Sequence, residues 1–499
     1  MKNTLTKAAL ALSLGLGLAG CKDALDIQPQ QGIELATAFN TPQKVGAAVI
    51  GCYAQLDNSS LYGTDLILVP ELMASDGYIT WRGSFQNYAQ LANHIQNSQI
   101  SNALGIWSAA YANINQTNLV LANLKVVSDS AQRQQFRGEM HFIRAAMYFE
   151  LVRLYAQQYR AGGRNSQPGV PINLTPNNSI AQADVQLPRA TVEQVYAQIS
   201  SDLQAAVKGL PALNVTRASS YSAEALLARV YLQQGNYPAA RAAADDVITN
   251  SGAALAGTLA AVFANRNSAE SLFEIQQNDQ NNAGTANSGL ATFFAGYSPT
   301  GDQGILYGRS DVQVNGIVPP NPHYSKRYTD NFTGFAALHD SLDARGPDTL
   351  TILSSKKLLY VSDGNNRPGQ LRTAKWRTYG QDIPLIRLAE MYLIRAECDI
   401  RTGQSGLADI NRVRQRSGAI PRTSAALADV LLERQLELAF EGFSIYDLKR
   451  TDGIVRPARA ATSTSPAVPA IKANDPIEIL PIPYQEINNN HNLTQNPGY

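Results

Sequence analysis

The sequence predicts a mainly α-helical fold, in which a scaffold of helix pairs similar to tetratricopeptide repeats carries a long loop-rich insertion with few short strands. The segment 222–249 is the first observation, because its apolar residues recur at i, i+3, i+4, i+7 and i+8, the spacing of one helix face. Gly235 and Asn236 end that pattern, and an alanine-rich apolar stripe that starts at Tyr237 follows. This pattern predicts two short antiparallel helices joined by a tight turn.

The second observation is that the first helix of this pair has two relatives elsewhere in the chain. Each of the three carries a glutamate and an arginine five positions apart, in Glu139–Arg144, Glu224–Arg229 and Glu390–Arg395. Five residues turn a helix by about 500°, so the two charges cannot pair within one helix and are expected to pack against neighbouring helices. The copies lie too far apart for a tandem array, which predicts helical repeats separated by long insertions.

The third observation is that the helical period fades between residues 250 and 384. A short strand is predicted at 271–276, and the segment 278–328 is rich in Asn, Gly, Tyr and Phe. A stretch of this length without regular structure is usually either functional or disordered, and its aromatic residues argue against disorder. We therefore expect function in the insertion.

Turn and capping residues predict the other elements in chain order. Thr41 and Pro42 start a helix, and 76–88 has no sustained period and is expected to be a loop. A long helix is predicted over 131–155. Further elements are an extended connector at 161–189, a helix at 191–210 with Thr191 and Gln194 in capping-box positions, helices at 385–401, 406–416 and 427–441, and a low-complexity surface loop at 457–469.

Composition limits the classes of partner. The 499 residues contain 41 basic and 40 acidic side chains, so the near-neutral chain offers no bulk field for nucleic acid or an anionic membrane. Only 16% of the residues are charged, whereas Asn and Gln are abundant. Such a surface suits neutral ligands that form hydrogen bonds.

The N-terminus has the layout of a secretory signal. Lys2 and Lys7 precede the apolar run 8–18, which is too short to span a bilayer. The following Leu-Ala-Gly-Cys resembles the lipobox of bacterial lipoproteins, which implies cleavage after residue 20 and acyl chains on Cys21. Several such chains would hold the mature protein at a membrane. The alternative is an ordinary signal with an incidental cysteine.

The two remaining cysteines, Cys52 and Cys398, lie in apolar helical patterns. Buried free thiols are expected, and a disulfide between them is the alternative.

Motifs along nearly the whole chain resemble those of the SusD/RagB family of outer-membrane nutrient-binding lipoproteins. They are Cys21-Lys-Asp-Ala-Leu-Asp, Trp107-x3-Tyr111-x2-Ile114-x3-Asn118, Arg144-Ala with Tyr148-Phe149, Gly169-Val-Pro-Ile, Asp382-Ile-Pro-Leu-Ile-Arg-Leu-Ala-Glu390, Ile410-Asn-Arg-Val-Arg-Gln-Arg-Ser-Gly418, Glu433-Arg-Gln-Leu-Glu-Leu-Ala-Phe-Glu-Gly442, Asp447-Leu-Lys-Arg450 and Pro481-Ile-Pro-Tyr-Gln-Glu-Ile through Asn496-Pro-Gly-Tyr499. So many motifs in one order are highly specific.

The resemblance implies a fold, a function and partners. After a signal peptide at 1–20, we expect residues 21–499 to form a single body. Its helical scaffold takes in about 40–250 and 384–450, its loop-rich ligand-binding portion takes in about 56–100 and 250–383, and a C-terminal segment spans 451–499. Family members bind oligosaccharides, or peptides in some branches, and act as lids on a SusC-type TonB-dependent transporter in the outer membrane.

Motifs for catalysis or metal binding are absent from the sequence, and one dinucleotide-type match, Gly15-x-Gly17-x2-Gly20, is discarded because it lies in the signal with no strand before it. Gly-x4-Gly-Lys-Ser/Thr, Cys-x2-Cys, His-Glu-x2-His and Gly-x-Ser-x-Gly do not occur, and the five histidines lack metal-ligand spacing. We therefore expect no enzyme activity, no metal and no cofactor. Two carboxylates brought together by the fold are enough for a glycosidase, and Glu71 with Asp76 is the pair to test.

Elimination among the tryptophans selects one candidate for ligand binding. Trp107 lies in a helical segment and Trp376 precedes a scaffold strand or turn, so both are expected to pack. Trp81 is the tryptophan of an irregular, glycine-bounded loop. Its flat ring can stack on a pyranose while polar neighbours bind the hydroxyls. The alternative is that Trp81 packs in a local core.

The resemblance implies further ligand-binding residues, because the family takes its binding aromatics from an equivalent early loop and from the middle insertion. This implies that Tyr78 and Phe85 act with Trp81, and that Tyr297 acts with Tyr307. The nearby polar candidates are Arg82, Asp76 and Asn87.

The favoured function is a non-catalytic surface binder that captures a glycan and delivers it to the transporter. The alternatives are a binder of peptides or another polymer in the same arrangement, and a lipid-anchored hydrolase or a pure helical-repeat scaffold.

Overall fold

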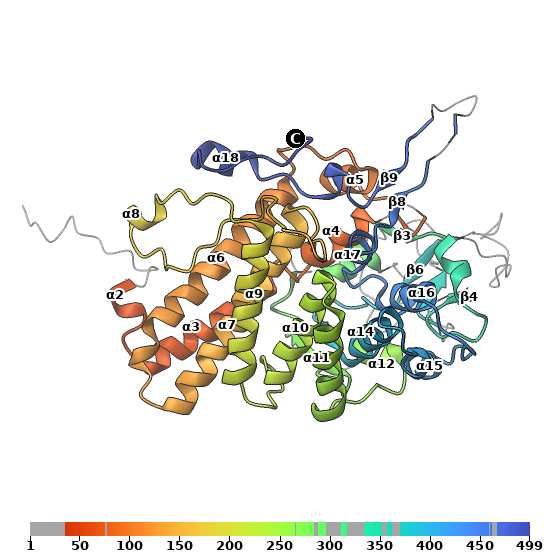
Figure 1. The fold of residues 1–499 in the computed structure, drawn as a ribbon, viewed down its shortest axis with the longest axis horizontal. Coiled ribbons are helices and arrows are strands. Elements are labelled where there is room, and N and C mark those ends of the chain that lie inside the picture. The colour runs from red at the N-terminus through yellow and green to blue at the C-terminus, as the bar shows by residue number, and fades with distance from the viewer. Residues whose placement is uncertain are drawn as a thin grey trace, which may run out of the picture.

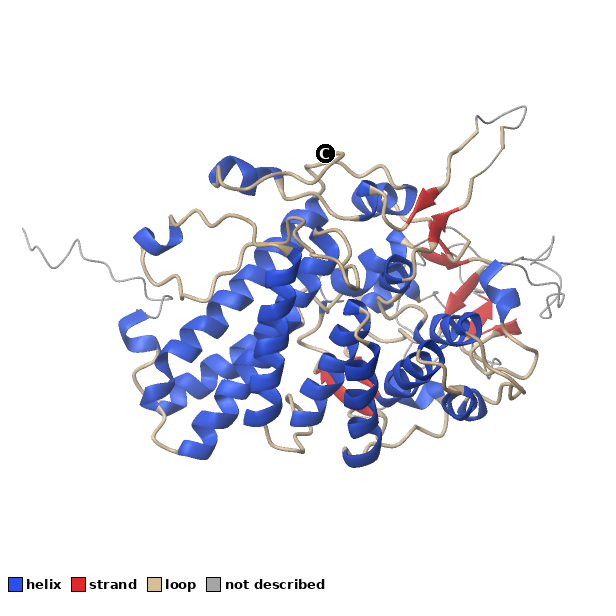
Figure 2. Cartoon of the chain, in the orientation of Figure 1, coloured by secondary structure: helices blue, strands red, loops and turns tan. Residues whose placement is uncertain are grey.

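The computed structural model is mainly α-helical, as the sequence predicts, with helices side by side on one flank and short strands gathered mostly at the other (Figures 1 and 2). It describes residues 35–74, 77–264, 266–283, 288–295, 311–316, 334–351, 357–361, 370–458, 460–461 and 467–499. Cys21 therefore lies outside the described residues.

Nine of the longer helices form the scaffold. They are α3 (Pro42–Leu56), α6 (Ser101–Asn123), α7 (Ser130–Tyr155), α9 (Val192–Gly209), α10 (Ser220–Gln234), α11 (Tyr237–Asn250), α14 (Leu388–Arg401), α15 (Leu407–Arg416) and α16 (Leu427–Leu438). Helices close in sequence pack together, as α6 does on α7 and α10 on α11. Helix α11 also packs on α14, across the long insertion. The scaffold is thus continuous in space although interrupted in sequence.

The helix pair predicted at 222–249 is confirmed as α10 and α11. Ser219 caps α10, and Gly235 ends it in the left-handed conformation with φ 70°. Asn236 then caps α11 by accepting from the amide of Ala239. A glycine is needed at the turn because this backbone conformation is strained for other residues.

The expected packing role is confirmed by ion pairs between helices for the three arginines of the Glu/Arg copies and for Glu390. Arg229 of α10 pairs with Glu390 of α14, with Nη2 2.6 Å from Oε2. Arg144 of α7 pairs with Asp202 of α9, with Nη2 2.7 Å from Oδ1. Arg395 of α14 pairs with Asp409 of α15, with Nη2 2.7 Å from Oδ1. The charges therefore fix how scaffold helices meet.

The predicted helix starts are also confirmed. Thr41 caps α3 with Pro42 in the first turn. The side chains of Thr191 and Gln194 form the expected capping box of α9. The helix predicted at 385–401 begins later, at Leu388, because the preceding residues pair as a strand.

Strands within the described residues form four small sheets. Their order is β1 (Ile79–Trp81) with β3 (Val312–Val314), β2 (Ser271–Ile275) with β7 (Ile383–Arg387), β4 (Pro347–Thr351) with β5 (Leu359–Val361) and β6 (Leu371–Thr373), and β8 (Ile454–Arg456) with β9 (Ile471–Lys472). Only β4 and β5 are parallel among these described pairs. The strand predicted at 271–276 is confirmed as β2.

Shorter helices connect these elements. They are α2 (Leu35–Ala38), α4 (Asp65–Met73), α5 (Gln86–Asn93), α8 (Ile180–Ala183), α12 (Leu259–Ala264), α13 (Leu290–Phe294), α17 (Ser444–Arg450), α18 (Tyr484–Asn489) and 3-10 turns at Leu124–Val126, Gly334–Leu338 and Pro476–Glu478. The connector at 161–189 is extended as predicted, apart from the single turn α8.

The core holds the residues that the sequence assigned to packing. Trp107 and Trp376 are buried, and the indole N–H of Trp376 donates to the Phe440 carbonyl at 2.8 Å. Cys52 and Cys398 are buried and free, which confirms the expected thiols, and burial raises the pKa of each to about 12. None of the helices among the described residues combines the length and apolarity needed to cross a membrane.

Candidate ligand-binding site

The early segment and the middle insertion, which are distant in sequence, meet in a two-stranded sheet. Strand β1 pairs with β3 so that Ile79 lies opposite Val314 and Trp81 opposite Val312. The backbone carbonyl of Asp311, the residue before β3, accepts a hydrogen bond from the backbone amide of Arg82 at 2.7 Å. The two parts that were expected to supply binding aromatics therefore lie side by side.

Four aromatic rings cluster at this junction. The Trp81 ring lies 5.0 Å from Tyr88 and 5.8 Å from Phe293, measured between ring centroids. Phe85 lies 6.1 Å from both Tyr88 and Phe293, with edge-to-face geometry. These are the separations at which aromatic pairs attract each other, so the cluster is a packed unit.

Trp81 is the base of this cluster, and the prediction that 76–88 is an irregular loop is wrong for part of the segment. Residues 79–81 form β1, because β3 supplies a pairing partner from far along the chain, and residues 86–88 start α5, whereas residues 82–85 between them are irregular as predicted. Pairing turns Trp81 inward, where only 9% of it is exposed. Phe85 belongs to the same cluster but is 38% exposed. Of these two rings, Phe85 is therefore the exposed one, whereas Trp81, which was expected to offer a flat face to a ligand, is covered.

Tyr78 belongs to the core, which corrects the expectation that it contacts ligand. It is 3% exposed and its ring lies 4.8 Å from Phe335 and 5.3 Å from Phe440, between centroids. Its hydroxyl accepts a hydrogen bond from the Phe440 amide at 2.6 Å. Burial, with the nearby Glu71 carboxylate, raises the pKa of Tyr78 well above its usual value.

Polar residues lie near Phe85 in sequence. Arg82 is exposed, and its Nε donates to Gln313 Oε1 at 3.2 Å. Asn87 is half-buried on α5, and its Nδ2 donates to Asn102 Oδ1 at 2.6 Å. The guanidinium of Arg82 and the amide of Asn87, three and two residues from Phe85 in sequence, are both groups that can bind sugar hydroxyls.

Three predicted residues, Asp76, Tyr297 and Tyr307, lie outside the described residues. The described segments 288–295 and 311–316, which flank the two tyrosines in sequence, both contact the aromatic cluster or its strand.

A buried carboxylate supports the cluster from α4. Tyr88 donates its hydroxyl to Asp65 Oδ1 at 2.8 Å, and Asn102 Nδ2 donates to Asp65 Oδ2 at 3.1 Å. Burial raises the pKa of Asp65 to about 6, although both hydrogen bonds act to lower it.

Sequence reasoning missed Asp65, Tyr88 and Phe293. Phe85, the N-cap of α5, and Tyr88 are three residues apart, about one helical turn. This spacing was a signal for their contact, but the loop prediction hid it. Phe293 lies in the aromatic-rich segment 278–328, where no motif distinguishes it from the other aromatic residues. No local pattern assigns Asp65 to this site, because its partners come from two other helices.

Glu71, one of the two candidates for a hydrolytic carboxylate, is engaged in the core. It is fully buried and accepts from the amides of Gly442 and Phe443 and from the Ser444 hydroxyl. A carboxylate held in this way does not reach a glycosidic bond at the surface. Among the described residues, no group of three or more His, Cys, Asp or Glu side chains is placed to hold a metal ion.

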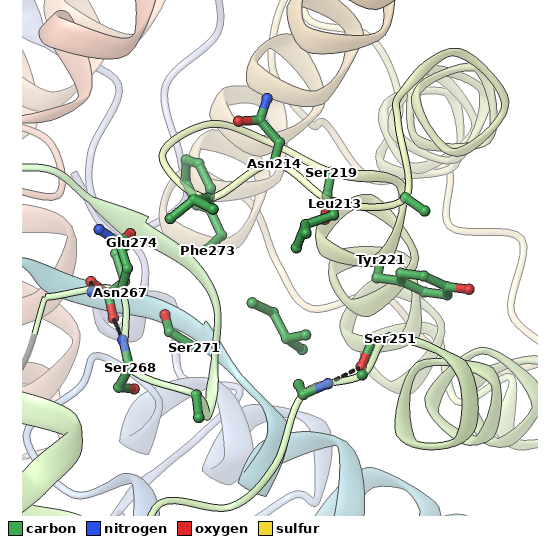
Figure 3. A pocket seen from close by; sticks show the side chains of 16 residues that line it. Leu213, Asn214, Ser219, Tyr221, Ser251, Asn267, Ser268, Ser271, Phe273 and Glu274 are labelled. Atoms are coloured by element: carbon green, nitrogen blue, oxygen red, sulfur yellow. Dashed lines mark hydrogen bonds between the residues drawn. The ribbon is translucent and has the colours of Figure 1, made fainter.

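Cavities also occur away from the aromatic cluster. One of about 240 Å³ lies between β2, the α9–α10 loop and the end of α11, with Ser268 and Ser271 on one side and Leu213 pointing in from the loop (Figure 3). A groove of about 480 Å³ runs along α16 and β8, and Tyr78 lines part of it. Phe85, Arg82 and Asn87 line neither, so both are separate from the aromatic site.

Two family models match the chain. The first, described as "Starch-binding associating with outer membrane", matches residues 23–232, and the second, described as the SusD family, matches residues 360–499.

Similar proteins include SusD-like protein P2 of Formosa agariphila, which is 26% identical over 97% of this chain and 98% of its own length. The starch-binding protein SusD of Bacteroides thetaiotaomicron is 31% identical over 26% of each chain.

Solved structures share the fold. A putative sugar binding protein from Bacteroides vulgatus superposes with a TM-score of 0.76 at 24% identity, covering 93% of this chain and 100% of that one. A laminarin binding SusD-like protein superposes with a TM-score of 0.67 at 22% identity, covering 92% of this chain and 100% of that one. Matching family models at both ends, a relative aligned over nearly its full length and the shared helical scaffold lead to one conclusion: the chain belongs to the SusD/RagB family.

Proposed function

We propose that this protein is a non-catalytic, outer-membrane glycan-binding lipoprotein that captures oligosaccharide or polysaccharide at the Phe85 site. The observation that carries the proposal is a 38% exposed aromatic ring, held on a packed aromatic cluster, with the polar residues Arg82 and Asn87 close to it in sequence. An apolar face beside a few oriented polar groups is the arrangement that a sugar ring requires. The family description, which names starch binding and the outer membrane, supports the same ligand class.

Within this proposal, Phe85 stacks on a sugar ring while Arg82 and Asn87 bind its hydroxyls, and Trp81 supports Phe85 through Tyr88 and Phe293. Asp76, Tyr297 and Tyr307 remain proposed contacts of the same ligand. Tyr78 and the fully buried Glu71 are left out, because both are held in the core.

Affinity electrophoresis in gels that contain laminarin or starch tests the proposal. We expect Phe85→Ala to lose retention by the polysaccharide that retards the wild-type protein, with little change in melting temperature because the ring is partly exposed. Tyr484→Ala is the matched control, since Tyr484 is a 49% exposed aromatic residue on α18. Retention that survives in Phe85→Ala, or that is lost equally in Tyr484→Ala, would contradict the site. Retention by neither glycan, with binding of peptides instead, would favour the peptide-binding alternative.

Trp81→Ala is expected to behave differently from Phe85→Ala. Because Trp81 is buried, its truncation should lower the free energy of unfolding by about 3 kcal/mol and disturb retention through Phe85. An unchanged melting temperature would show that the indole is not part of the packed base.

The proposal also includes an anchor and a transporter. Acyl chains on Cys21 would hold the protein at the outer membrane, and a SusC-type TonB-dependent transporter would receive the glycan. Cys21→Ser should therefore release the protein from the membrane fraction and abolish co-purification with that transporter from detergent-solubilised membranes. Release of reducing sugar from laminarin or starch by the purified protein would contradict the non-catalytic role.

A further inference from the structure

A chain of side-chain hydrogen bonds runs from the buried Asp65 to the surface beside Phe85. Asn102 Nδ2 donates to Asp65 Oδ2 at 3.1 Å, and Asn87 Nδ2 donates to Asn102 Oδ1 at 2.6 Å. The other Asp65 oxygen accepts from the Tyr88 hydroxyl at 2.8 Å. Asp65 is 6% exposed and Asn102 is 4% exposed, whereas Asn87 reaches the surface. These hydrogen bonds therefore link the interior to the proposed glycan site.

The charge on Asp65 gives this chain a direction. An ionised carboxylate only accepts hydrogen bonds, so Asn102 must turn its Nδ2 towards Asp65. The buried Asn102 Oδ1 then needs a donor, because an unpaired buried carbonyl costs about 1–3 kcal/mol. Asn87 meets this need only by turning its own Nδ2 inward, which leaves its Oδ1 as an acceptor at the surface.

We propose that Asp65 is a positioning residue that sets the orientation of the Asn87 amide, so that Asn87 Oδ1 accepts a hydrogen bond from a ligand hydroxyl beside Phe85. The inference rests on the proposed glycan site and adds to it a chemical requirement. The sugar unit at Phe85 must carry a free hydroxyl as donor towards Asn87. An ether at that position, such as an O-methyl group, would place two acceptors against each other.

The surroundings of Asp65 make this orientation sensitive to pH. The groups that face its carboxylate are Tyr88 on α5, Asn102 on α6 and Tyr155 on α7. None carries a positive charge, and burial raises the pKa of Asp65 to about 6. Protonation turns one carboxylate oxygen into a donor, which lets Asn102 present its carbonyl to Asp65 and reverses the chain. The affinity for glycan should thus be highest well above pH 6 and should fall as the pH drops through about 6.

A double-mutant cycle tests the proposal at a pH well above the pKa of Asp65. The measurement is calorimetric binding of whichever probe, laminarin or starch, the wild-type protein retains. Asp65→Asn and Asn87→Ala should each weaken binding about fivefold, the effect of one hydrogen bond of about 1 kcal/mol. Because Asp65 acts through Asn87, the double variant should bind no more weakly than Asn87→Ala alone. Fully additive losses, or unchanged affinity in Asp65→Asn, would overturn the inference.

Asp57→Asn is the matched control for this cycle. Asp57 is also buried, accepts from Gln277 Nε2, and has a pKa that burial raises to about 6. Asp57 is not part of the hydrogen-bond chain that runs from Asp65 through Asn102 to Asn87. Its substitution should leave both the affinity and the pH dependence unchanged, and a pH dependence that disappears in Asp57→Asn would contradict the role of Asp65.

A measurement without ligand keeps the inference testable if Asp65→Asn folds poorly. In wild-type protein labelled with 15N-asparagine, the side-chain amide resonances of Asn87 and Asn102 should shift together, with a midpoint near pH 6. Resonances that stay fixed through this range would overturn the hydrogen-bond chain. Resonances that shift in a protein that binds neither polysaccharide would instead contradict the glycan site and, with it, the role given to Asn87.

Discussion

Gly83 lies against the edge of Trp81 and shows how closely single residues are packed under the proposed site. A Cβ atom added to Gly83 would lie 2.4 Å from Trp81 Cζ2 and 2.7 Å from Asp311 Cγ. Both distances are shorter than van der Waals contact, so the Cβ atom would clash. The indole cannot move aside easily, because it packs against Tyr88 and Phe293. Glycine is therefore needed here for the close approach of the chain to the ring.

Gly83→Ala should displace the indole, lower the free energy of unfolding by about 1–3 kcal/mol and reduce glycan retention. Intrinsic tryptophan fluorescence, urea denaturation and affinity gels measure the three effects. Gly51→Ala on α3 is the control, because its Cβ would meet nothing within 4 Å, and alanine should stabilise the helix by about 1 kcal/mol. A normal indole spectrum in Gly83→Ala would contradict the tight packing.

Helices α14, α16 and α17 are joined by a buried group of charges. Asp447 of α17 accepts from Arg434 Nε of α16 at 2.9 Å and from Arg450 Nε at 2.8 Å. Arg450 in turn bonds Glu397 of α14, with Nη2 2.7 Å from Oε2. Burial acts to raise the pKa of Asp447, but the two guanidinium groups outweigh it and hold the pKa at about 2.

This arrangement predicts how the helices respond to acid. Because the pKa of Asp447 is lower in the folded state than its ordinary value of 3.8, its stabilisation is present above pH 3.8 and is lost as the pH falls towards 2. The loss amounts to about 2 kcal/mol. Urea denaturation across this range should show a smaller acid loss in Asp447→Asn than in wild type. Asp184→Asn, which removes an exposed carboxylate of the 161–189 connector, should follow the wild-type curve.

The two halves of the scaffold meet through a buried ion pair. Arg229 on α10 donates through Nε and Nη2 to both oxygens of Glu390 on α14, and Nη2 also donates to the Leu385 carbonyl. The side chains are 4% and 0% exposed. The scaffold helices before and after the long insertion are thus joined by this ion pair as well as by apolar packing.

Arg229→Ala should destabilise the whole molecule by about 3–5 kcal/mol, because it leaves Glu390 buried without its partner. Thermal and urea unfolding provide the measurement. The control is Arg160→Ala, which removes an exposed pair with Asp452 and should change the free energy of unfolding by less than about 1 kcal/mol. Equal losses in the two variants would show that burial does not set the strength of the pair.

The sequence was sufficient for the features that depend on neighbouring residues. The helix pair around Gly235, the caps of α3 and α9 and the packing role of the Glu/Arg copies follow from periodicity and from backbone groups that need nearby partners. The ordered motifs were sufficient for the family.

The orientation of the site residues depended on contacts between distant segments. Strand β3 turns Trp81 inward and leaves Phe85 exposed, and helices α4 and α6 supply the Asp65 and Asn102 that orient Asn87. These partners lie tens to hundreds of residues away, and a strand or amide takes its direction from whichever group it pairs with. Local patterns therefore identified the segment that carries the proposed site, whereas the packing of the folded chain decided which of its side chains are exposed there.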